Sequence, residues 1–419
     1  MAEVIPFRGI CYNPGKVEAG SVTAPPYDVI GPELLRSLYE RSPHNIARVD
    51  AGEQLPGDTP EENRYTRASA LLREWLGDGV LREDRSPCLY AYEVRYAVEG
   101  KRKRLRGVFA MVKLEPFGSG HIYPHECTHA KARDDRLSLL AATGVNTSPI
   151  FSSDLNRNSR TSALLDRLSE GGVPPFLEAA DADGFLHRLW VIDDPEATAA
   201  FQSDLDGRAV FIADGHHRYE TALEYQRARK EMPGLPAGQT PVENAPFDYV
   251  LMFLANIADG GLTVLPTHRL VRSGPAQKIP ECLGEHFETE ELPAGSDILK
   301  GIKGMKNTFG IYTHGGKCYR AAYDGSNLAG CHPALRELDV VILHEFLINR
   351  MMGAPAVAYE MDVRAAIRQV ESGCWDAAFF LNPTSINEVM EVALSGQRMP
   401  PKSTYFYPKI RTGFVMCRT

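Results

Sequence analysis

Apolar residues recur with helical spacing in some segments of the chain and alternate with polar residues in others. Apolar positions three or four residues apart indicate amphipathic helices. They predict helices over residues 33–40, 61–75, 131–143, 159–170, 215–230, 335–351 and 363–371. Strict alternation or short apolar runs predict strands over residues 89–96, 105–114, 189–192, 209–212 and 249–255.

Two pairs of strands have the spacing of hairpins. The basic stretch 100–104 is expected to form the tip of one hairpin, with 105–114 as its return strand. Residues 247–257 and 262–271 are expected to pair around Asp259-Gly-Gly261. Residues 231–246 contain four prolines and are expected to form a loop.

The mixture of helices and strands predicts the mixed α/β (α+β) fold class. A chain of 419 residues is long enough for two or more domains. We expect an N-terminal α/β lobe (1–104), a core that carries the main motifs (105–274), and a C-terminal α/β lobe (275–419) whose end returns to the site.

The net charge and the number and spacing of the cysteines bear on which partners and which cellular compartment are expected. The chain has 46 basic and 54 acidic residues and a net charge of −8, which disfavours general nucleic-acid binding. The basic stretch 101–104 is therefore interpreted as a solvated turn. No apolar run approaches the roughly 18 residues of a membrane span. Eight scattered cysteines without C-x-x-C predict reduced thiols in a cytoplasmic protein.

The most informative motif follows the apolar residues 210–213 and opens a predicted helix. A strand that enters a helix through a glycine places backbone N–H groups and the positive helix end at one point, where an anion is favoured. The motif predicts a phosphate or nucleotide site, with Mg²⁺ on Asp214 as a further expectation. Its residues are Asp214, Gly215, His216, His217 and Arg218. A capped helix with structural histidines is the alternative.

A second motif, His125-Glu-Cys-Thr-His129, has the H-E-x-x-H spacing of zinc peptidases. Gly118, Gly120 and Pro124 precede it, so it lies at the start of a helix and not inside one. We therefore favour a catalytic site in which Glu126 is a general base and His125 contacts a phosphate or hydroxyl group, with His217 as a further catalytic candidate. A zinc hydrolase stays open as an alternative.

Two later motifs carry hydrogen-bond donors. Pro266-Thr-His-Arg269 ends an apolar strand, and Pro401-Lys-Ser-Thr404 lies on a chain stiffened by prolines. Both are expected to bind phosphate, through His268, Arg269, Lys402, Ser403 and Thr404. The expected substrate-binding residues are Tyr27 and Asp28, which follow a double proline, together with Asp135 and Arg136.

These motifs together resemble a bacterial and archaeal family known as domain of unknown function 1015. The resemblance rests on Ala24-Pro-Pro-Tyr-Asp28, His125-Glu126, Asp135-Arg136, Asp214 to Arg218, Pro266 to Arg269, and Met399 to Thr404 with Pro408-Lys409. The Asp-Gly-His-His-Arg segment is also similar to the phosphate-binding motif of the ParB (SpoOJ)/sulfiredoxin-like superfamily. That resemblance implies a ParB-like core and a relation to kinases that act on free serine.

The resemblance implies a phosphotransferase or phosphate-ester hydrolase that handles serine or phosphoserine with a nucleotide such as ATP, ADP or CTP. Phosphoryl transfer needs charge neutralisation and positioning more than covalent chemistry, which suits a site of this composition. A non-catalytic, ParB-like nucleotide-binding switch is the main alternative. The expected partner is a small phosphate-bearing molecule, and a homo-oligomer stays open.

Overall fold

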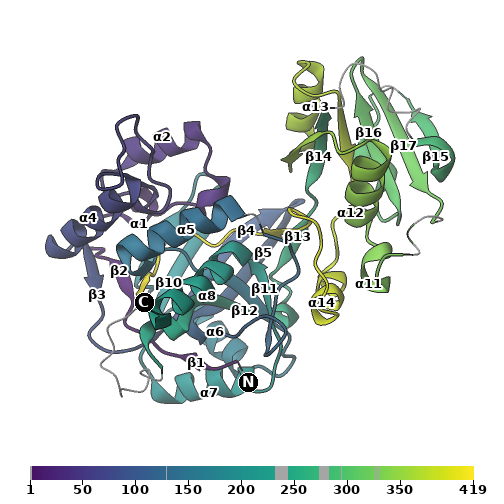
Figure 1. The fold of residues 1–419 in the computed structure, drawn as a ribbon. Helices are drawn as coiled ribbons and strands as arrows, with labels where there is room; N and C mark the ends of the chain where they lie inside the picture. Colours follow the sequence, from purple (N-terminus) through teal and green to yellow (C-terminus); the bar gives the residue numbers. More distant parts are fainter. Residues whose placement is uncertain are drawn as a thin grey trace. The chain divides into compact units, whose positions relative to one another are not determined.

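The protein is described from a computed structural model, which covers residues 2–128, 130–231, 244–272, 283–293, 295–325, 328 and 330–419. The chain divides into two compact units (Figure 1). The first unit contains Met1–Pro124, Thr128–Leu262 and Pro408–Thr419, and the second contains His125–Cys127 and Thr263–Tyr407. This division differs from the expected boundaries: residue 105 lies within a continuous strand, and the boundary near 275 falls outside the described residues.

A nine-stranded mixed sheet forms the centre of the first unit. Its order is β6-β11-β8-β12-β5-β4-β10-β9, and β1 also pairs with β5. The pairs β12–β8 and β11–β6 are parallel, and the other pairs are antiparallel. The strands are β1 (Val4–Ile5), β4 (Leu89–Val98), β5 (Lys101–Lys113), β6 (Ile122–Tyr123), β8 (Ile150–Asp154), β9 (Leu177–Ala180), β10 (Leu186–Ile192), β11 (Val210–Asp214) and β12 (Tyr249–Asn256).

The two faces of this sheet bury different side chains because neighbouring residues of a strand point to opposite sides. On one face, apolar residues such as Val108 and Met252 pack against helices α6 (Arg160–Glu170), α7 (Pro195–Leu205) and α8 (His216–Glu231). The other face carries aromatic rings, including Tyr92, which lies 5.3 Å from the ring of Phe414 in the C-terminal segment. The C-terminal segment is thereby held against the sheet.

The N-terminal segment of the first unit is mainly helical. Its helices are α1 (Ala19–Val22), η1 (Tyr27–Val29), α2 (Pro32–Arg41), α3 (Ala47–Asp50) and α4 (Arg64–Gly77). They share an apolar core around Trp75 with α5 (Ala130–Thr143), which lies beside α8 (Figure 1). Two short ribbons complete the unit: β2 (Ile10–Tyr12) with β3 (Leu81–Glu83), and β7 (Val145–Asn146) with β21 (Cys417–Arg418).

The second unit is built on a six-stranded antiparallel sheet of order β15-β17-β16-β19-β14-β18. Its strands are β14 (His268–Arg272), β15 (Phe287–Leu292), β16 (Thr308–Thr313), β17 (Lys317–Tyr323), β18 (Ala356–Glu360) and β19 (Ala377–Phe380). A separate ribbon pairs β13 (Thr263–Leu265) with β20 (Tyr405–Tyr407). The helices among its described residues are η4 (Gly284–His286), α10 (Ile298–Ile302), α11 (Pro333–Arg336), α12 (Asp339–Val341), the π-helical η5 (Ile342–Met351), α13 (Val363–Glu371) and α14 (Ile386–Leu394).

The predicted fold class is confirmed, and so are most of the predicted elements. The expected hairpin of residues 247–257 with 262–271 is wrong, because β12 pairs with β5 and β8 while β13 and β14 belong to the other unit. The first hairpin has its tip at Glu99 and Gly100, whose φ angles are 48° and 73°, so the basic residues 101–104 begin the return strand. No helix of the described residues is long and apolar enough to cross a membrane.

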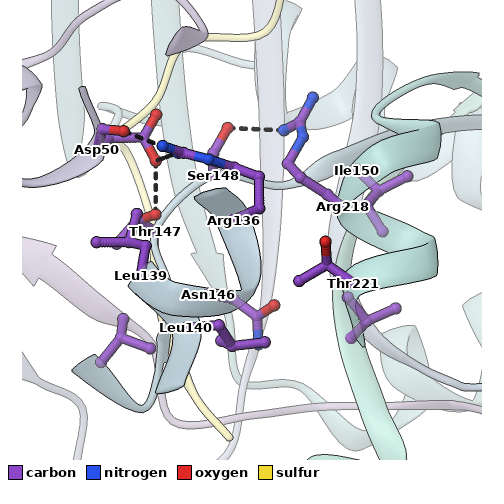
Figure 2. Close-up of a pocket in the computed structure, with 12 residues that line it drawn as sticks. Asp50, Arg136, Leu139, Leu140, Asn146, Thr147, Ser148, Ile150, Arg218 and Thr221 are labelled. Carbon is purple, nitrogen blue, oxygen red and sulfur yellow. Dashed lines mark hydrogen bonds and ion pairs between the residues drawn. The ribbon is translucent and has the colours of Figure 1, made fainter. Parts of the chain in front are cut away.

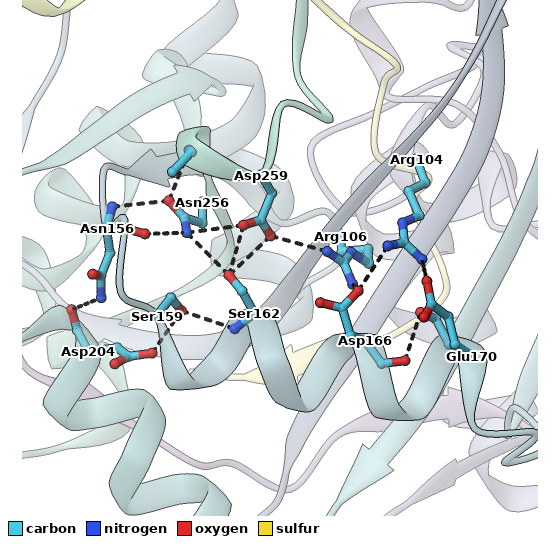
Figure 3. Close-up of polar contacts among 12 residues, drawn as sticks. Arg104, Arg106, Asn156, Ser159, Ser162, Asp166, Glu170, Asp204, Asn256 and Asp259 are labelled. Carbon is cyan, nitrogen blue, oxygen red and sulfur yellow. Dashed lines mark hydrogen bonds and ion pairs between the residues drawn. The ribbon is translucent and has the colours of Figure 1, made fainter.

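Buried Asp154, at the end of β8, predicts a pH dependence of stability. Burial raises its pKa to about 7 although the charge of Arg208 opposes the rise, and the nearby charges of Asp204 and Asp259 add to it. Asp204 and Asp259 belong to a polar network at the start of α6 and the end of β12 (Figure 3). The folded protein therefore holds a proton that the unfolded chain releases near pH 4.

We expect the free energy of unfolding contributed by this group to be fully present below pH 4 and lost as pH rises through about 7. Asp154→Asn, which carries no titrating proton, removes this dependence, so the variant gains stability over the natural chain as pH rises. Urea unfolding at pH 5 and pH 8 measures the difference. If the difference in the free energy of unfolding between the two proteins is the same at both pH values, the raised pKa of Asp154 is contradicted.

Candidate functional site

The turn that opens α8 has the geometry predicted from the motif. Strand β11 ends at Asp214, Gly215 has φ of +95°, and the 16-residue helix α8 begins at His216. A Cβ atom on residue 215 would lie 2.9 Å from Nη2 of Arg218. Two features therefore require glycine at position 215. Its backbone is left-handed, and the guanidinium of Arg218 packs directly against it. His216 is buried and His217 is half-buried in the first turn of the helix.

Two cations meet at the carboxylate of Asp214. Nη2 of Arg218 donates to one carboxylate oxygen at 3.0 Å, and Nζ of Lys409 donates to the other at 2.9 Å. The side chains of Arg218 and Lys409 are only 11% and 12% exposed, so both charges are largely removed from water. Because one carboxylate faces two cations and a helix N-terminus, the group keeps an excess of positive charge for an anion.

Arg218 also reaches the loop before β8. Its Nη1 donates to the hydroxyl of Ser148 at 2.7 Å (Figure 2). The same atom donates to the carbonyl of Pro149. The hydroxyl of Thr412, in the C-terminal segment, lies 3.1 Å from that of Ser148. Nε of Arg218 is buried and has no hydrogen-bond partner among the described residues. The guanidinium is therefore positioned by the protein while one of its donors is left unused.

The predicted substrate residues Tyr27, Asp135 and Arg136 lie together in the same unit. The guanidinium of Arg136 stacks 3.9 Å above the ring of Tyr27, and its Nε donates to Asp135 at 2.8 Å. Its Nη1 donates to the carbonyl of buried Asp50 at 2.8 Å, and the carboxylate of Asp50 accepts from the hydroxyl of Thr147 at 2.7 Å. Three of the four predicted residues therefore form one network.

The charge of Arg218 acts on the pKa of Tyr27, which belongs to this network. Burial raises the pKa of Tyr27 to about 12, although the charges of Arg136 and Arg218 oppose the rise. Burial also acts to raise the pKa of Asp135, but the ion pair with Arg136 outweighs it and holds this pKa below its ordinary value. Asp28 is exposed, and its charge acts on the hydroxyl of Tyr27.

A cavity of about 40 Å³ lies between Arg136 and Arg218 (Figure 2). Asp50, Thr147 and Ser148 contribute to its lining. The cavity has room for ordered water or a small anionic group, whereas bound organic ligands occupy pockets of several hundred Å³. Apolar side chains such as Leu139, Leu140 and Ile150 complete the lining, so both guanidinium groups border one small space of mixed polarity.

The carboxylate of Asp214, on which Mg²⁺ is expected, is occupied by two cations. Mg²⁺ requires carboxylate oxygens that are free to coordinate it, and both oxygens of Asp214 accept hydrogen bonds from cations. Across the described ranges, no group of three or more His, Cys, Asp and Glu side chains is arranged to hold a metal ion. The expectation of Mg²⁺ on Asp214 is therefore not supported by its surroundings.

The second unit brings together the predicted residues near Glu126 and those near Lys402. Residue 126 forms a parallel bridge with Met399, and its Oε1 accepts a hydrogen bond from the backbone N–H of Lys402 at 2.8 Å. Lys402 has φ of +58°, which is uncommon for a lysine. Buried His125 lies 3.0 Å from the hydroxyl of Thr404, and Ser403 donates to the carbonyl of Pro400 at 2.6 Å.

Arg269 lies in the same unit and is fully buried. Its Nη2 donates to the carbonyl of Lys402 at 3.2 Å, and its guanidinium lies 5.6 Å from the ring of Tyr359. Burial lowers its pKa to about 10, while Tyr359 and Glu126 partly offset this effect. Nε of Arg269 and Nδ1 of His344 have no hydrogen-bond partner among the described residues. Unused buried donors of this kind are typical of sites completed by water or a ligand.

His268 lies in mainly apolar surroundings. Its ring is fully buried, 4.9 Å from the ring of Phe380, and burial lowers its pKa to about 4. His268 and Arg269 are adjacent in β14, so their side chains leave opposite faces of the sheet. Both ring nitrogens of His268, like Nε of Arg269, have no hydrogen-bond partner among the described residues, so phosphate binding by these two residues stays a prediction.

The zinc alternative required His125, Glu126 and His129 on one helical face. Glu126 lies instead in an extended segment that pairs with Met399, and α5 begins only at residue 130. His129 lies outside the described residues. The helical spacing on which the zinc prediction depended is therefore absent between residues 125 and 128.

Sequence reasoning missed several members of the first-unit network, namely Asp50, Thr147, Ser148, Lys409 and Thr412. The first two lie at a helix end and in a loop, where no periodic pattern marks them. Lys409 belongs to the Pro-Lys pair that contributed to the family resemblance, but its side chain was not assigned a role. The Asp214 group belongs to the first unit and the Glu126 group to the second, and each is described by itself.

Because both the backbone and the packing of Arg218 require glycine at position 215, replacing Gly215 is expected to weaken ligand binding. Gly215→Ala strains the backbone and displaces the guanidinium of Arg218, so we expect it to weaken phosphate and nucleotide binding by about ten-fold or more. Gly207→Ala is the matched control, because Gly207 also has positive φ (69°) but no atom lies within 4 Å of the added methyl group. Each change costs about 1–2 kcal/mol of stability. Calorimetric titration with ADP that finds equal affinity in both variants contradicts the prediction.

Several solved structures are similar to the chain over about 70% of its length. A free serine kinase in complex with AMP is 14% identical, with a TM-score of 0.36, and the match covers 70% of this chain and 89% of that one. A conserved hypothetical protein from Pyrococcus furiosus is 15% identical (TM-score 0.35; 70% and 92% covered). SbnI with a C-terminal truncation, from Staphylococcus aureus, is 13% identical (TM-score 0.37; 73% and 85% covered).

No curated protein matches the chain. The family described as "Protein of unknown function (DUF1015)" matches residues 4–341, which is most of the sequence. The wider resemblance to the ParB/sulfiredoxin-like superfamily stays a prediction. The chain therefore belongs to the DUF1015 family.

Proposed function

We propose that the protein is a phosphotransferase or phosphate-ester hydrolase that handles serine or phosphoserine with a nucleotide. The observation that carries the proposal is the meeting of Arg218 and Lys409 at Asp214, in front of the first turn of α8. A carboxylate bridged by two poorly exposed cations at a helix N-terminus marks a place where oxyanions are favoured. The choice of serine rests on the motif resemblance alone.

The arrangement supports phosphoryl transfer through charge neutralisation. In such reactions the transferred group spreads negative charge over its oxygens, and fixed cations stabilise it. Arg218 offers a planar guanidinium held by Ser148 and Pro149, and Lys409 offers a compact charge. An incoming phosphate competes with Asp214 for both cations.

Glu126 is the proposed general base, on the strength of its motif. Its carboxylate is oriented by the backbone N–H of Lys402, and its charge acts on buried Arg269. We expect Glu126→Gln to lower kcat by about a hundred-fold or more while nucleotide affinity is kept. Glu371→Gln is the control, because Glu371 also accepts a hydrogen bond, from the hydroxyl of Tyr312 at 2.9 Å. Equal kcat in the two variants removes Glu126 from the reaction.

The function is tested by ³¹P NMR on the whole chain with ATP, ADP or CTP and either serine or phosphoserine. The proposal predicts transfer or release of phosphate in at least one combination, and loss of that product in Arg218→Ala. Nucleotide binding without any product in all combinations identifies the ParB-like switch instead. Absence of both binding and product contradicts the proposal.

A further inference from the structure

A second, larger pocket lies in the N-terminal helical segment of the first unit. Its volume is about 570 Å³, which is within the range of sites for organic ligands. It is formed by α2, by the segment that follows α3, and by the start of α4. The side chains that matter for recognition are Arg36, Tyr39, Glu40, Arg48, Glu53 and Arg64.

The three arginines of this pocket keep donors for a ligand. Across the described ranges, Arg36 and Arg48 form no ion pair with a carboxylate. Arg48 donates to the carbonyl of Tyr39 at 2.8 Å, and its guanidinium stacks 4.2 Å from the ring of Tyr39. Arg64 uses only Nη2, toward Tyr65 and Asp135, in the hydrogen bonds of the described residues. Guanidinium donors of this kind suit phosphate oxygens.

A chain of charged contacts joins this pocket to the α8 site. Arg64 bonds Asp135, which bonds Arg136 at 2.8 Å, and Arg136 borders the small cavity together with Arg218. The pocket also begins at Ile30, directly after the η1 turn that contains Tyr27. The 40 Å³ cavity between Arg136 and Arg218 is too small for a nucleoside, whereas the neighbouring pocket is large enough.

We propose that this pocket is the binding site for the nucleoside monophosphate part of the nucleotide. The stacked pair of Tyr39 and Arg48 supplies a planar surface against which a base can stack, and Arg36 and Arg64 supply cations for phosphate. This inference rests on the proposed function. It places the nucleoside monophosphate part of the nucleotide in this pocket, whereas the proposed function places the terminal phosphates at the α8 turn.

The test compares two charge reversals on one helix. Arg36→Glu places a negative charge in the pocket, whereas Arg41→Glu places one in the last turn of α2, outside the pocket lining. Both residues are exposed, so neither change is expected to prevent folding. Affinities for AMP and for pyrophosphate are measured by calorimetric titration on the whole chain.

We expect Arg36→Glu to weaken AMP binding by about ten-fold or more and to leave pyrophosphate binding unchanged, while Arg41→Glu alters neither. AMP binding that is equal in both variants, with pyrophosphate still lost in Arg218→Ala, overturns the pocket assignment and leaves the proposed function in place. Failure of the natural chain to bind either AMP or pyrophosphate overturns both.

Discussion

Arg218→Ala is expected to lower turnover by about a hundred- to a thousand-fold, the usual effect of removing one fixed donor to a developing oxyanion. Arg218 is the residue through which the α8 turn, Asp214 and the loop at Ser148 are connected. Its removal takes away one of two cations at the site and leaves Lys409 alone opposite Asp214. Steady-state kinetics with the active nucleotide and substrate pair measure the change.

Arg208→Ala is the control for this prediction. Arg208 lies in the same unit and, like Arg218, donates from Nη1 to a loop carbonyl, that of Leu155 at 3.1 Å, but it does not line the cavity that Arg218 borders. We expect its turnover to match that of the natural chain. An Arg218→Ala variant that retains full turnover and a native melting temperature removes the α8 turn from the mechanism.

Arg136→Met is expected to lower the free energy of unfolding by about 3–5 kcal/mol. The change leaves Asp50, which is only 2% exposed, without its cation, and the hydroxyl of Thr147 becomes the remaining side-chain donor to its carboxylate. A buried charge that loses its partner retains the full cost of desolvation. Equilibrium urea unfolding measures the loss.

Two further variants isolate the cause of that loss. Adding Asp50→Asn to Arg136→Met removes the unpaired charge and is expected to restore part of the stability. Arg188→Met breaks an exposed ion pair with Glu178, of 2.6 Å, and is expected to cost less than about 1 kcal/mol. A loss as small in Arg136→Met as in Arg188→Met contradicts the view that Arg136 neutralises a buried carboxylate.

Local pattern in the sequence predicted the elements that depend on neighbouring residues. The helices observed as α2, α5, α6 and α13, and the strands observed as β4, β10 and β12, follow from the spacing of apolar residues. The predicted helix over 335–351 is divided into α11, α12 and the π-helical η5. Apolar spacing reports which side is buried, and it does not separate an α-helix from a wider π-helix.

The spacing of neighbouring residues did not predict which distant strands pair with each other. Residues 247–257 and 262–271 are neighbours in sequence with glycines between them, which favours a hairpin. The chain instead leaves the first unit at Leu262, and β13 finds its partner in β20, about 140 residues later. Local pattern also could not predict the positions of Lys409 and Thr412. They lie near the site because the last twelve residues return to the first unit.

The sequence identified the residues at the start of α8 as a candidate site, but it did not identify the contacts that join them to distant residues. Asp214, Gly215 and Arg218 stand out in sequence because several polar residues follow a buried strand directly. The stacking of Arg136 on Tyr27 joins residues more than 100 positions apart, and nothing in their local spacing indicates it. Single serine and threonine residues such as Ser148 carry no pattern until the fold places them beside a charge.

The central claim is that the turn at Gly215 binds phosphate, and a crystal structure of the chain with ADP tests it most directly. The account predicts phosphate density within hydrogen-bonding distance of the backbone N–H groups in the first turn of α8, with Arg218 or Lys409 released from Asp214 to contact it. Density for ADP elsewhere, with Asp214 still bridging both cations, contradicts the claim.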